Sequence, residues 1–268
     1  TSTLSSFWPR FVLNDPAPTA IYPLSLPAAL PISAFAPGAA CPYGPNAGTP
    51  ELRQALSSWL GAGEDSIMLA AGSQAALFAL FQAWLGEGDE ALVPDPGFVA
   101  YPTLAAMAGG RVVAYPLAGD GSLDPGSFAN ALARAPRARI AVVNHPSNPT
   151  GAGAGRGALA EVAKLCQAHG VVLVADEVYR DLYLGAKPDG ILDSGPMPGV
   201  VALGSMSKAF AAPGLRVGWA WGDPEVLAPA RLVHNAMTSC LSWPAQAAAV
   251  ALLRDADAVV KESRRQLA

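Results

Sequence analysis

Seven short apolar segments alternate with segments of helical periodicity from about residue 51 onward, and this alternation restricts the chain to few folds. In residues 73–85, large apolar residues recur every three or four positions, as on one face of a helix. The seven apolar segments are IMLAAG, ALVP, RVVAYPL, RIAVVN, VVLVADE, VVALG and RVGWAWG. Unbroken apolar strands separated by helices are typical of parallel sheets that are covered on both faces. The sequence therefore predicts an α/β domain with a mostly parallel sheet.

The composition narrows the classes of partner. A formal net charge of −4 provides no general attraction for nucleic acid or for an anionic membrane surface. No uninterrupted apolar segment approaches the length of a membrane span, and the three histidines lack metal-ligand spacing. The cysteines, Cys41, Cys166 and Cys240, form no CxxC pair, and Cys166 falls on the apolar stripe of a predicted helix. We therefore expect no nucleic acid, membrane or metal partner, a buried reduced thiol at Cys166, and a cytoplasmic location.

The two ends of the chain depart from the alternating pattern. The stretch IYPLSLPAALPIS, residues 21–33, carries three prolines and shows no readable period. It is either translated sequencing-adapter contamination or a proline-rich arm that lies across a partner subunit, and the sequence leaves both readings open. Near the other end, Pro244 starts a helical pattern that continues over residues 247–268. We therefore divide the chain into an irregular segment (1–40), a main domain (41–243) and a terminal helical region (244–268).

A lysine in an unusual setting follows the apolar segment 200–204. The motif GSMSK (204–208) places Lys208 among small residues in an apolar neighbourhood, whereas most lysines are solvated surface charges. A lysine so placed loses its proton readily and forms an imine with an aldehyde. Eight residues later, Arg216 offers a fork of donors to a phosphate. This S-x-S-K pattern followed by G-L-R-x-G resembles that of class I/II aminotransferases, which depend on pyridoxal phosphate.

An acidic residue ends the predicted strand 171–175. Asp176 lies at the carboxyl end of this strand, where ligands bind in open α/β sheets. A buried carboxylate is costly unless it is paired, and a protonated pyridine nitrogen is a suitable partner because an ionised Asp keeps that nitrogen protonated. The alternative is that Asp176 caps a helix or pairs with Arg180. The neighbouring Glu177 is expected to be structural.

The resemblance assigns further residues to the cofactor ring. Tyr179 and Asn148, the latter in NHPSNPTG, match family residues that hydrogen-bond the phenolic oxygen of the cofactor. Phe98 stands where the family has an aromatic side chain stacked on the ring. Asn148 lies 28 residues before Asp176, which lies 32 residues before Lys208, and this order and spacing are similar to those of the family.

The resemblance also assigns residues to the cofactor phosphate. They form a loop that runs into a helix, two hydroxyls and an arginine: Gly72, Ser73, Gln74, Ser205, Ser207 and Arg216. Backbone N–H groups at a helix start do bind phosphate, although AAGSQAAL is in isolation also an ordinary helix start. Tyr43, in YGPNAGTPELRQAL, matches the tyrosine that reaches the phosphate of the neighbouring subunit, so the resemblance implies a homodimer.

The resemblance covers most of the chain, from Tyr43 onward. It implies the fold type I architecture, a three-layer α/β/α large domain that binds pyridoxal 5'-phosphate, with the C-terminal small domain missing. It implies transfer of an amino group between an L-amino acid and a 2-oxo acid by a ping-pong mechanism, with Lys208, Asp176 and Tyr179 as catalytic residues. The missing domain would bear the arginine that binds the substrate carboxylate. We therefore expect this chain to bind the cofactor but to catalyse poorly or not at all.

Three other functions fit parts of the same pattern. A pyridoxal-phosphate-dependent carbon–sulfur lyase would use the same cofactor residues. A regulator with an aminotransferase-like sensor domain would need a DNA-binding module, and no basic helix-turn-helix pattern is present in this chain. An inert fragment would not fold alone. The motifs GSQAAL and YGPNAGTPELRQAL resemble the branch with aspartate, succinyldiaminopimelate and aromatic aminotransferases, and they do not identify the amino donor.

Overall fold

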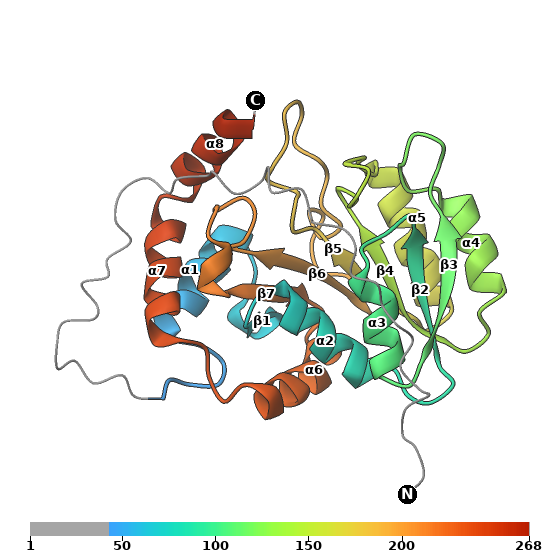
Figure 1. Ribbon diagram of the computed structural model, residues 1–268, viewed down its shortest axis with the longest axis horizontal. Coiled ribbons are helices and arrows are strands. Elements are labelled where there is room, and N and C mark those ends of the chain that lie inside the picture. Colours follow the sequence, from blue (N-terminus) through green and yellow to red (C-terminus); the bar gives the residue numbers. More distant parts are fainter. Residues whose placement is uncertain (1–42, 268) are drawn as a thin grey trace, which may run out of the picture.

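The computed structural model describes residues 43–267, which form a seven-stranded sheet covered by helices on both faces (Figure 1). The expectations for residues 1–40 and for Cys41 fall outside these residues. Within residues 43–267, no helix is long and apolar enough to cross a membrane.

Each of the seven apolar segments forms a strand of one sheet. The strands are β1 (Ile67–Ala70), β2 (Glu90–Asp95), β3 (Arg111–Pro116), β4 (Ala138–Asn144), β5 (Val172–Asp176), β6 (Val200–Ser205) and β7 (Gly218–Gly222). Their order is β1-β7-β6-β5-β4-β2-β3, with β2 to β6 parallel and β7 antiparallel to both of its neighbours. The predicted, mostly parallel sheet is confirmed.

The helices occupy the segments between the strands and the end of the chain. They are α1 (Pro50–Leu60), α2 (Ser73–Trp84), α3 (Ala100–Met107), α4 (Pro125–Ala133), α5 (Arg156–Ala168), α6 (Pro224–Met237), α7 (Trp243–Arg254) and α8 (Ala256–Leu267), with 3-10 turns η3 (Glu64–Ser66) and η4 (Pro213–Leu215). Asp124 caps α4 by accepting the N–H groups of Gly126 and Ser127, and proline follows at the first helical position. This start is the one that Asp followed by Pro predicts.

Alternation along the strands divides the apolar core between the two faces of the sheet. Val201 and Leu203 of β6 pack on one face with α2, α3 and α6, while Val200 and Ala202 pack on the other face with α4 and α5. Toward the β1 edge of that second face, α1 and α7 cover β1 and β7 in a third cluster, which includes Trp219. Successive side chains of a strand point to opposite faces, so apolar residues at every position require this double cover. The three-layer α/β/α architecture is thereby confirmed (Figure 1).

Two local features test smaller expectations. Cys166 of α5 is buried as a free thiol, as predicted, and its burial raises the pKa of the thiol to about 12.

The helical pattern over residues 247–268 is interrupted, because Asp255 leaves the helical conformation (φ −118°, ψ 33°) between α7 and α8. The carbonyl of Asp255 accepts the N–H of Val259 in the first turn of α8. Aspartate favours such helix-start positions over helix interiors, which explains the break.

Candidate functional site

Polar residues end three adjacent parallel strands at the same edge of the sheet. Asn144 ends β4, Asp176 ends β5 and Ser205 ends β6, and Asn144 lies opposite Asp176 in the register of the two strands. The chain reverses from β6 to β7 beside this edge, and residues 206–217 of that connection carry Lys208 and Arg216. The strand-end position predicted for Asp176 is therefore observed.

Asp176 lies at the centre of this edge and is 4% exposed. Its Oδ2 accepts a hydrogen bond from the Tyr101 hydroxyl at 2.7 Å, while its Oδ1 is buried and has no hydrogen-bond partner within residues 43–267. Burial raises the pKa of Asp176, and the hydrogen bond from Tyr101, the N–H of Val178 and the positive charge of Lys208 oppose that rise. The Tyr101 hydroxyl thus holds one carboxylate oxygen. No group within residues 43–267 makes a hydrogen bond of good geometry to the other oxygen, although the N–H of Val178 is near enough to favour the charged form.

Arg180 is not the partner of Asp176. Its guanidinium binds Asp193 at 2.6 Å and lies 3.8 Å from Glu177. Glu177 accepts the backbone N–H of Ile191 at 2.7 Å, and burial raises the pKa of its carboxyl to about 7. Glu177 and Arg180 thus tie down the loop that follows β5, in agreement with a structural role for Glu177.

Tyr101 is the site residue whose role sequence reasoning missed. It is fully buried in α3, and burial together with the neighbouring Asp176 raises the pKa of its hydroxyl, so it remains a donor at neutral pH. Its ring packs edge-to-face against Phe98, with ring centres 5.6 Å apart. The i, i+3 spacing from Phe98 was the available signal, but only the packing of α3 on the sheet shows that the hydroxyl reaches Asp176.

Lys208 follows β6 and is partly buried next to Tyr179. Its Nζ lies 5.0 Å from the centre of the Tyr179 ring, and its charge acts on Asp176. Lys208 is therefore an electrostatic neighbour of Tyr179 and Asp176, the other two residues predicted to be catalytic.

A group of donors suited to an anion lies around the start of α2. Gly72 has a φ of 90° and its Cα faces the guanidinium of Arg216, so a Cβ at this position would collide with that side chain. Arg216 Nη1 lies 3.5 Å from Ser207 Oγ, which in turn accepts from Ser205 Oγ at 2.8 Å. Within residues 43–267, no carboxylate lies within salt-bridge distance of Arg216. The predicted residues Gly72, Ser73, Ser205, Ser207 and Arg216 thus form one cluster, called here the anion cup.

The loop with Asn148 is tied to the end of β5 through a different asparagine. Asn144 Nδ2 donates to the carbonyl of Asp176 at 3.0 Å, and Asn144 Oδ1 accepts the backbone N–H of Asn148 at 2.6 Å. The side chain of Asn148, which sequence reasoning selected, makes no hydrogen bond within residues 43–267. Asn144 therefore positions the loop, and it was detectable in the sequence only as the last residue of a strand.

His145, the residue that follows β4, anchors the same loop and is 1% exposed. Its Nδ1 accepts the N–H of Ala154 at 2.7 Å, and its Nε2 lies 2.6 Å from the carbonyl of Asp189. An acceptor at Nδ1 and a donor at Nε2 require the neutral ring. The pKa of His145 is lowered, mainly because burial disfavours the charged ring.

This burial predicts a loss of stability in mild acid. Because the folded pKa lies below the unfolded value of about 6.5, the unfolded state binds more protons as the pH falls below that value. The contribution of His145 to the free energy of unfolding is therefore complete above about pH 6.5 and declines as the pH falls toward the folded pKa. Urea unfolding at pH 7.5 and pH 5 should show that the stability difference between the unmodified chain and His145→Gln shrinks in acid. A difference that stays constant over this range would contradict the prediction.

Gln74 and Arg216 face a second feature, an open apolar pocket of about 520 Å³. Its other lining residues include Val99, Met107 and Met237, which are all exposed.

Tyr43 is 89% exposed and makes no hydrogen bond to the anion cup within the described chain. The structure of one chain therefore does not bring Tyr43 to the cup, and its assignment to a neighbouring subunit's site stays a prediction.

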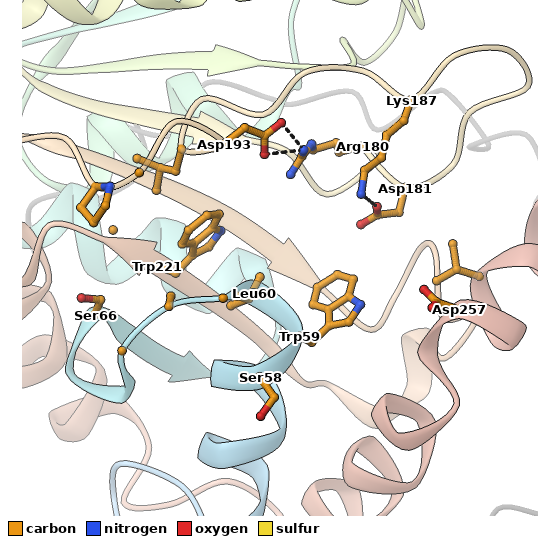
Figure 2. A pocket seen from close by; sticks show the side chains of 18 residues that line it. Ser58, Trp59, Leu60, Ser66, Arg180, Asp181, Lys187, Asp193, Trp221 and Asp257 are labelled. Atoms are coloured by element: carbon orange, nitrogen blue, oxygen red, sulfur yellow. Dashed lines mark hydrogen bonds and ion pairs between the residues drawn. The ribbon is translucent and has the colours of Figure 1, made fainter.

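A hollow larger than the apolar pocket beside Gln74 lies elsewhere. It measures about 690 Å³ and is bounded by the end of α1, the loop after β5, the end of β7 and the start of α8 (Figure 2). Figure 2 shows that its cations are already paired, Arg180 with Asp193 and Lys187 with Asp181. It contains none of the predicted site residues, so volume alone would have selected a different location from the chemistry at the strand ends.

Comparison with known proteins agrees with this geometry. The family model described as aminotransferase class I and II matches residues 28–268. Kynurenine–oxoglutarate transaminase 1 of Rattus norvegicus is 35% identical over 225 residues, covering 75% of this chain and 52% of the relative. Aspartate/prephenate aminotransferase of Thermus thermophilus is 34% identical over 228 residues, covering 81% of this chain and 57% of the relative.

Solved structures give the same result. Aspartate aminotransferase from Thermus thermophilus with maleate superposes with a TM-score of 0.79 at 33% identity, covering 84% of this chain and 61% of that one. N-succinyldiaminopimelate aminotransferase from Mycobacterium tuberculosis superposes with a TM-score of 0.78 at 29% identity, covering 84% and 62%. The chain thus spans about half to three fifths of the length of these relatives.

Proposed function

Because this chain belongs to the aminotransferase class I and II family, we propose that it forms the cofactor-binding part of a pyridoxal-phosphate-dependent aminotransferase. The reaction moves an amino group between an L-amino acid and a 2-oxo acid in two half-reactions. Members of this family depend on pyridoxal phosphate, so the residues of this chain must fit a protonated ring nitrogen at one end and a phosphate at the other.

The observation that carries the proposal is the buried Oδ1 of Asp176. A buried acceptor without a donor is destabilising, and natural proteins retain few of them. A protonated pyridine nitrogen supplies the missing donor and a compensating positive charge. Tyr101 occupies Oδ2, so it directs Oδ1 as the oxygen available to the ring nitrogen.

The anion cup fits the phosphate. The N–H groups at the start of α2 carry a partial positive charge, and Arg216 adds a full charge without a carboxylate competitor in residues 43–267. The hydroxyls of Ser205, Ser207 and Ser73 supply further hydrogen bonds. Gly72 leaves the Arg216 guanidinium room to lie directly against the backbone of the turn.

The proposed mechanism divides the work among residues of this chain. Bound pyridoxal phosphate supplies an aldehyde carbon and a ring that accepts electrons from the substrate α-carbon. Lys208 would hold the bound cofactor through its Nζ, and as a free amine it would carry a proton to and from the substrate α-carbon. Asp176 keeps the ring nitrogen protonated. Tyr179 and Asn148 bind the phenolic oxygen, and Phe98 packs on the ring.

An absorbance titration tests the proposal. The purified chain is mixed with pyridoxal phosphate, the visible band of bound cofactor is recorded, and borohydride reduction followed by peptide mapping locates the attachment. We expect a single modified residue, Lys208. Absence of the band, or attachment at another lysine, would refute the proposed function.

We also propose that the chain works as a homodimer in which Tyr43 serves the neighbouring site. Support comes from exposed apolar side chains at the pocket beside Gln74 and Arg216, among them Val99 (81% exposed) and Met107 (60% exposed). Exposed apolar patches next to a functional site mark interaction surfaces. A partner chain that covers this pocket would exclude water from the anion cup.

The dimer predicts a specific effect of surface charge. A chain with both Val99→Asp and Met107→Asp should shift from dimer to monomer in size-exclusion chromatography with light scattering, because the charges cannot be buried without partners. Leu184→Asp, at an equally exposed apolar position that does not line this pocket, is the matched control and should leave the mass unchanged. A monomeric unmodified chain, or a double variant that remains dimeric, would contradict the proposed interface.

The proposal includes a cytoplasmic location. Cys166 and Cys240 are both free thiols, and Cys166 is buried in the core. Reduced cysteines persist in the cytosol, whereas oxidising compartments favour disulfides.

A further inference from the structure

The turn between β1 and α2 donates a hydrogen bond to a side chain of α6, a helix that sequence reasoning did not connect with the site. The backbone N–H of Ala71 donates to Nε2 of His234, at 3.3 Å. His234 lies in the last turns of α6 and is 2% exposed. The turn continues through Gly72 into Ser73 and Gln74, the residues whose N–H groups begin α2. His234 therefore acts on the backbone immediately before the anion cup.

Helix α6 holds α2 at both ends. At the carboxyl end of α2, Trp84 Nε1 donates to the carbonyl of Val226 in the first turn of α6, at 3.1 Å. At the amino end of α2, the contact is that between Ala71 and His234. The two helices lie side by side against the same face of the sheet (Figure 1). The histidine contact thus sets the position of the end of α2 that faces the anion cup.

The same helix also holds the start of β1. Arg231, three residues before His234, donates to the carbonyls of Asp65 and Ile67, the latter at 3.1 Å. Arg231 and His234 thereby contact the two ends of a four-residue strand. With β1 fixed between them, the turn at Ala71 has little freedom to move along the strand direction.

The opposite side of the turn is fixed by close backbone packing. A Cβ on Gly218 would collide with the backbone of Gly72 and Ser73, so β7 supports the turn directly. The N–H of Gly72 donates to the carbonyl of Ala70 at 2.7 Å. The hydrogen bond to His234 comes from a side chain outside the turn, so it can be removed by mutation without altering the turn's own residues.

We propose that His234 is a positioning residue for phosphate binding: its Nε2 holds Ala71, so that the N–H groups of Ser73 and Gln74 stay aligned toward the anion. The inference rests on the proposed function. To accept this hydrogen bond the ring must be neutral with its proton on Nδ1, and burial lowers the pKa of His234 in agreement with that state. Without the acceptor, the partly buried N–H of Ala71 loses its partner, and the turn relaxes away from its position under the phosphate.

The test compares two cofactor forms that differ only in the phosphate. Pyridoxal phosphate and pyridoxal are each titrated against the 268-residue chain and its variants, and the visible band of bound cofactor gives the dissociation constants. His234→Leu removes the acceptor and keeps an apolar side chain. His234→Gln places an amide oxygen near the position of Nε2, and Leu232→Ala changes an exposed residue of the same helix. Thermal melting without cofactor checks that each variant folds.

We expect His234→Leu to weaken pyridoxal phosphate binding about tenfold, the size of effect caused by the loss of one hydrogen bond at a partly buried donor. Binding of pyridoxal should change less than about twofold, and His234→Gln should recover most of the lost affinity. Leu232→Ala should match the unmodified chain. If His234→Leu does not fold, His234→Asn, which ends short of the turn, takes its place.

Two outcomes would overturn the inference while leaving the proposed function intact. One is equal weakening of pyridoxal and pyridoxal phosphate in His234→Leu, which would indicate a general structural role. The other is failure of His234→Gln to bind better than His234→Leu. By contrast, an unmodified chain that binds neither compound would refute the proposed function and this inference with it.

Discussion

Lys208→Ala is expected to abolish covalent attachment of pyridoxal phosphate to this chain. The chain has four lysines, and Lys208 is the one that lies next to Tyr179 and within electrostatic reach of Asp176. No other amine can form the bond in the same place, because the anion cup fixes where the phosphate lies. The visible band of bound cofactor and the borohydride-trapped peptide should both disappear.

Lys187→Ala is the matched control for this loss. Lys187 is half-exposed and its Nζ is 2.8 Å from Asp181 in the wall of the large hollow (Figure 2), so its removal should leave attachment unchanged. Substantial trapping in the Lys208→Ala chain, at the level of the unmodified chain, would show that the proposed site is wrong.

Asp176→Asn should give the second large effect: it should slow the reaction at the substrate α-carbon without lowering the melting temperature. Asparagine is similar in size but cannot hold a proton on the ring nitrogen by its charge, so the ring accepts electrons less well. We expect exchange of the substrate α-hydrogen with solvent deuterium to slow on the order of a hundredfold or more, as for loss of other preorganised electrostatic contacts. Nuclear magnetic resonance of the amino acid measures this exchange.

The same substitution should not lower the melting temperature of the chain without cofactor. Burial raises the pKa of Asp176, which means that the protein is strained by this charge before the cofactor binds. Neutral asparagine removes that strain and can still accept the Tyr101 hydroxyl. A large drop in melting temperature would indicate that Asp176 serves structure rather than the cofactor.

The architecture followed from local patterns for a physical reason. A strand buried on both faces must be apolar at every position, and β5 and β6 meet that requirement. The start of α4 was equally readable, because Asp124 and Pro125 satisfy the first backbone N–H positions by their own chemistry. The break at Asp255 was not predicted, because the helical pattern continues across it and only the preference of one aspartate for helix starts marks the position.

Within the site, the sequence alone selected the residues that adjoin a glycine-rich or proline-marked turn, such as Gly72, Lys208 and Arg216. It could not find Tyr101, His234 or the bridging role of Asn144, because each acts on a residue between 32 and 163 positions away or on backbone brought near by folding. Such contacts leave no period and no spacing in the chain.

By itself the sequence determined the α/β class and the order of the strands along the chain, because these depend on local apolar periodicity. Short motifs predicted Asp176 and Lys208 as the chemical centre. Tertiary structure alone decided which contacts surround these two residues. It determined that Tyr101 occupies one oxygen of Asp176 and leaves the other free, that Arg216 lies on Gly72, and that α6 holds the turn before α2. These outcomes depend on distances between separate elements, and such distances exist only once the helices have packed onto the sheet.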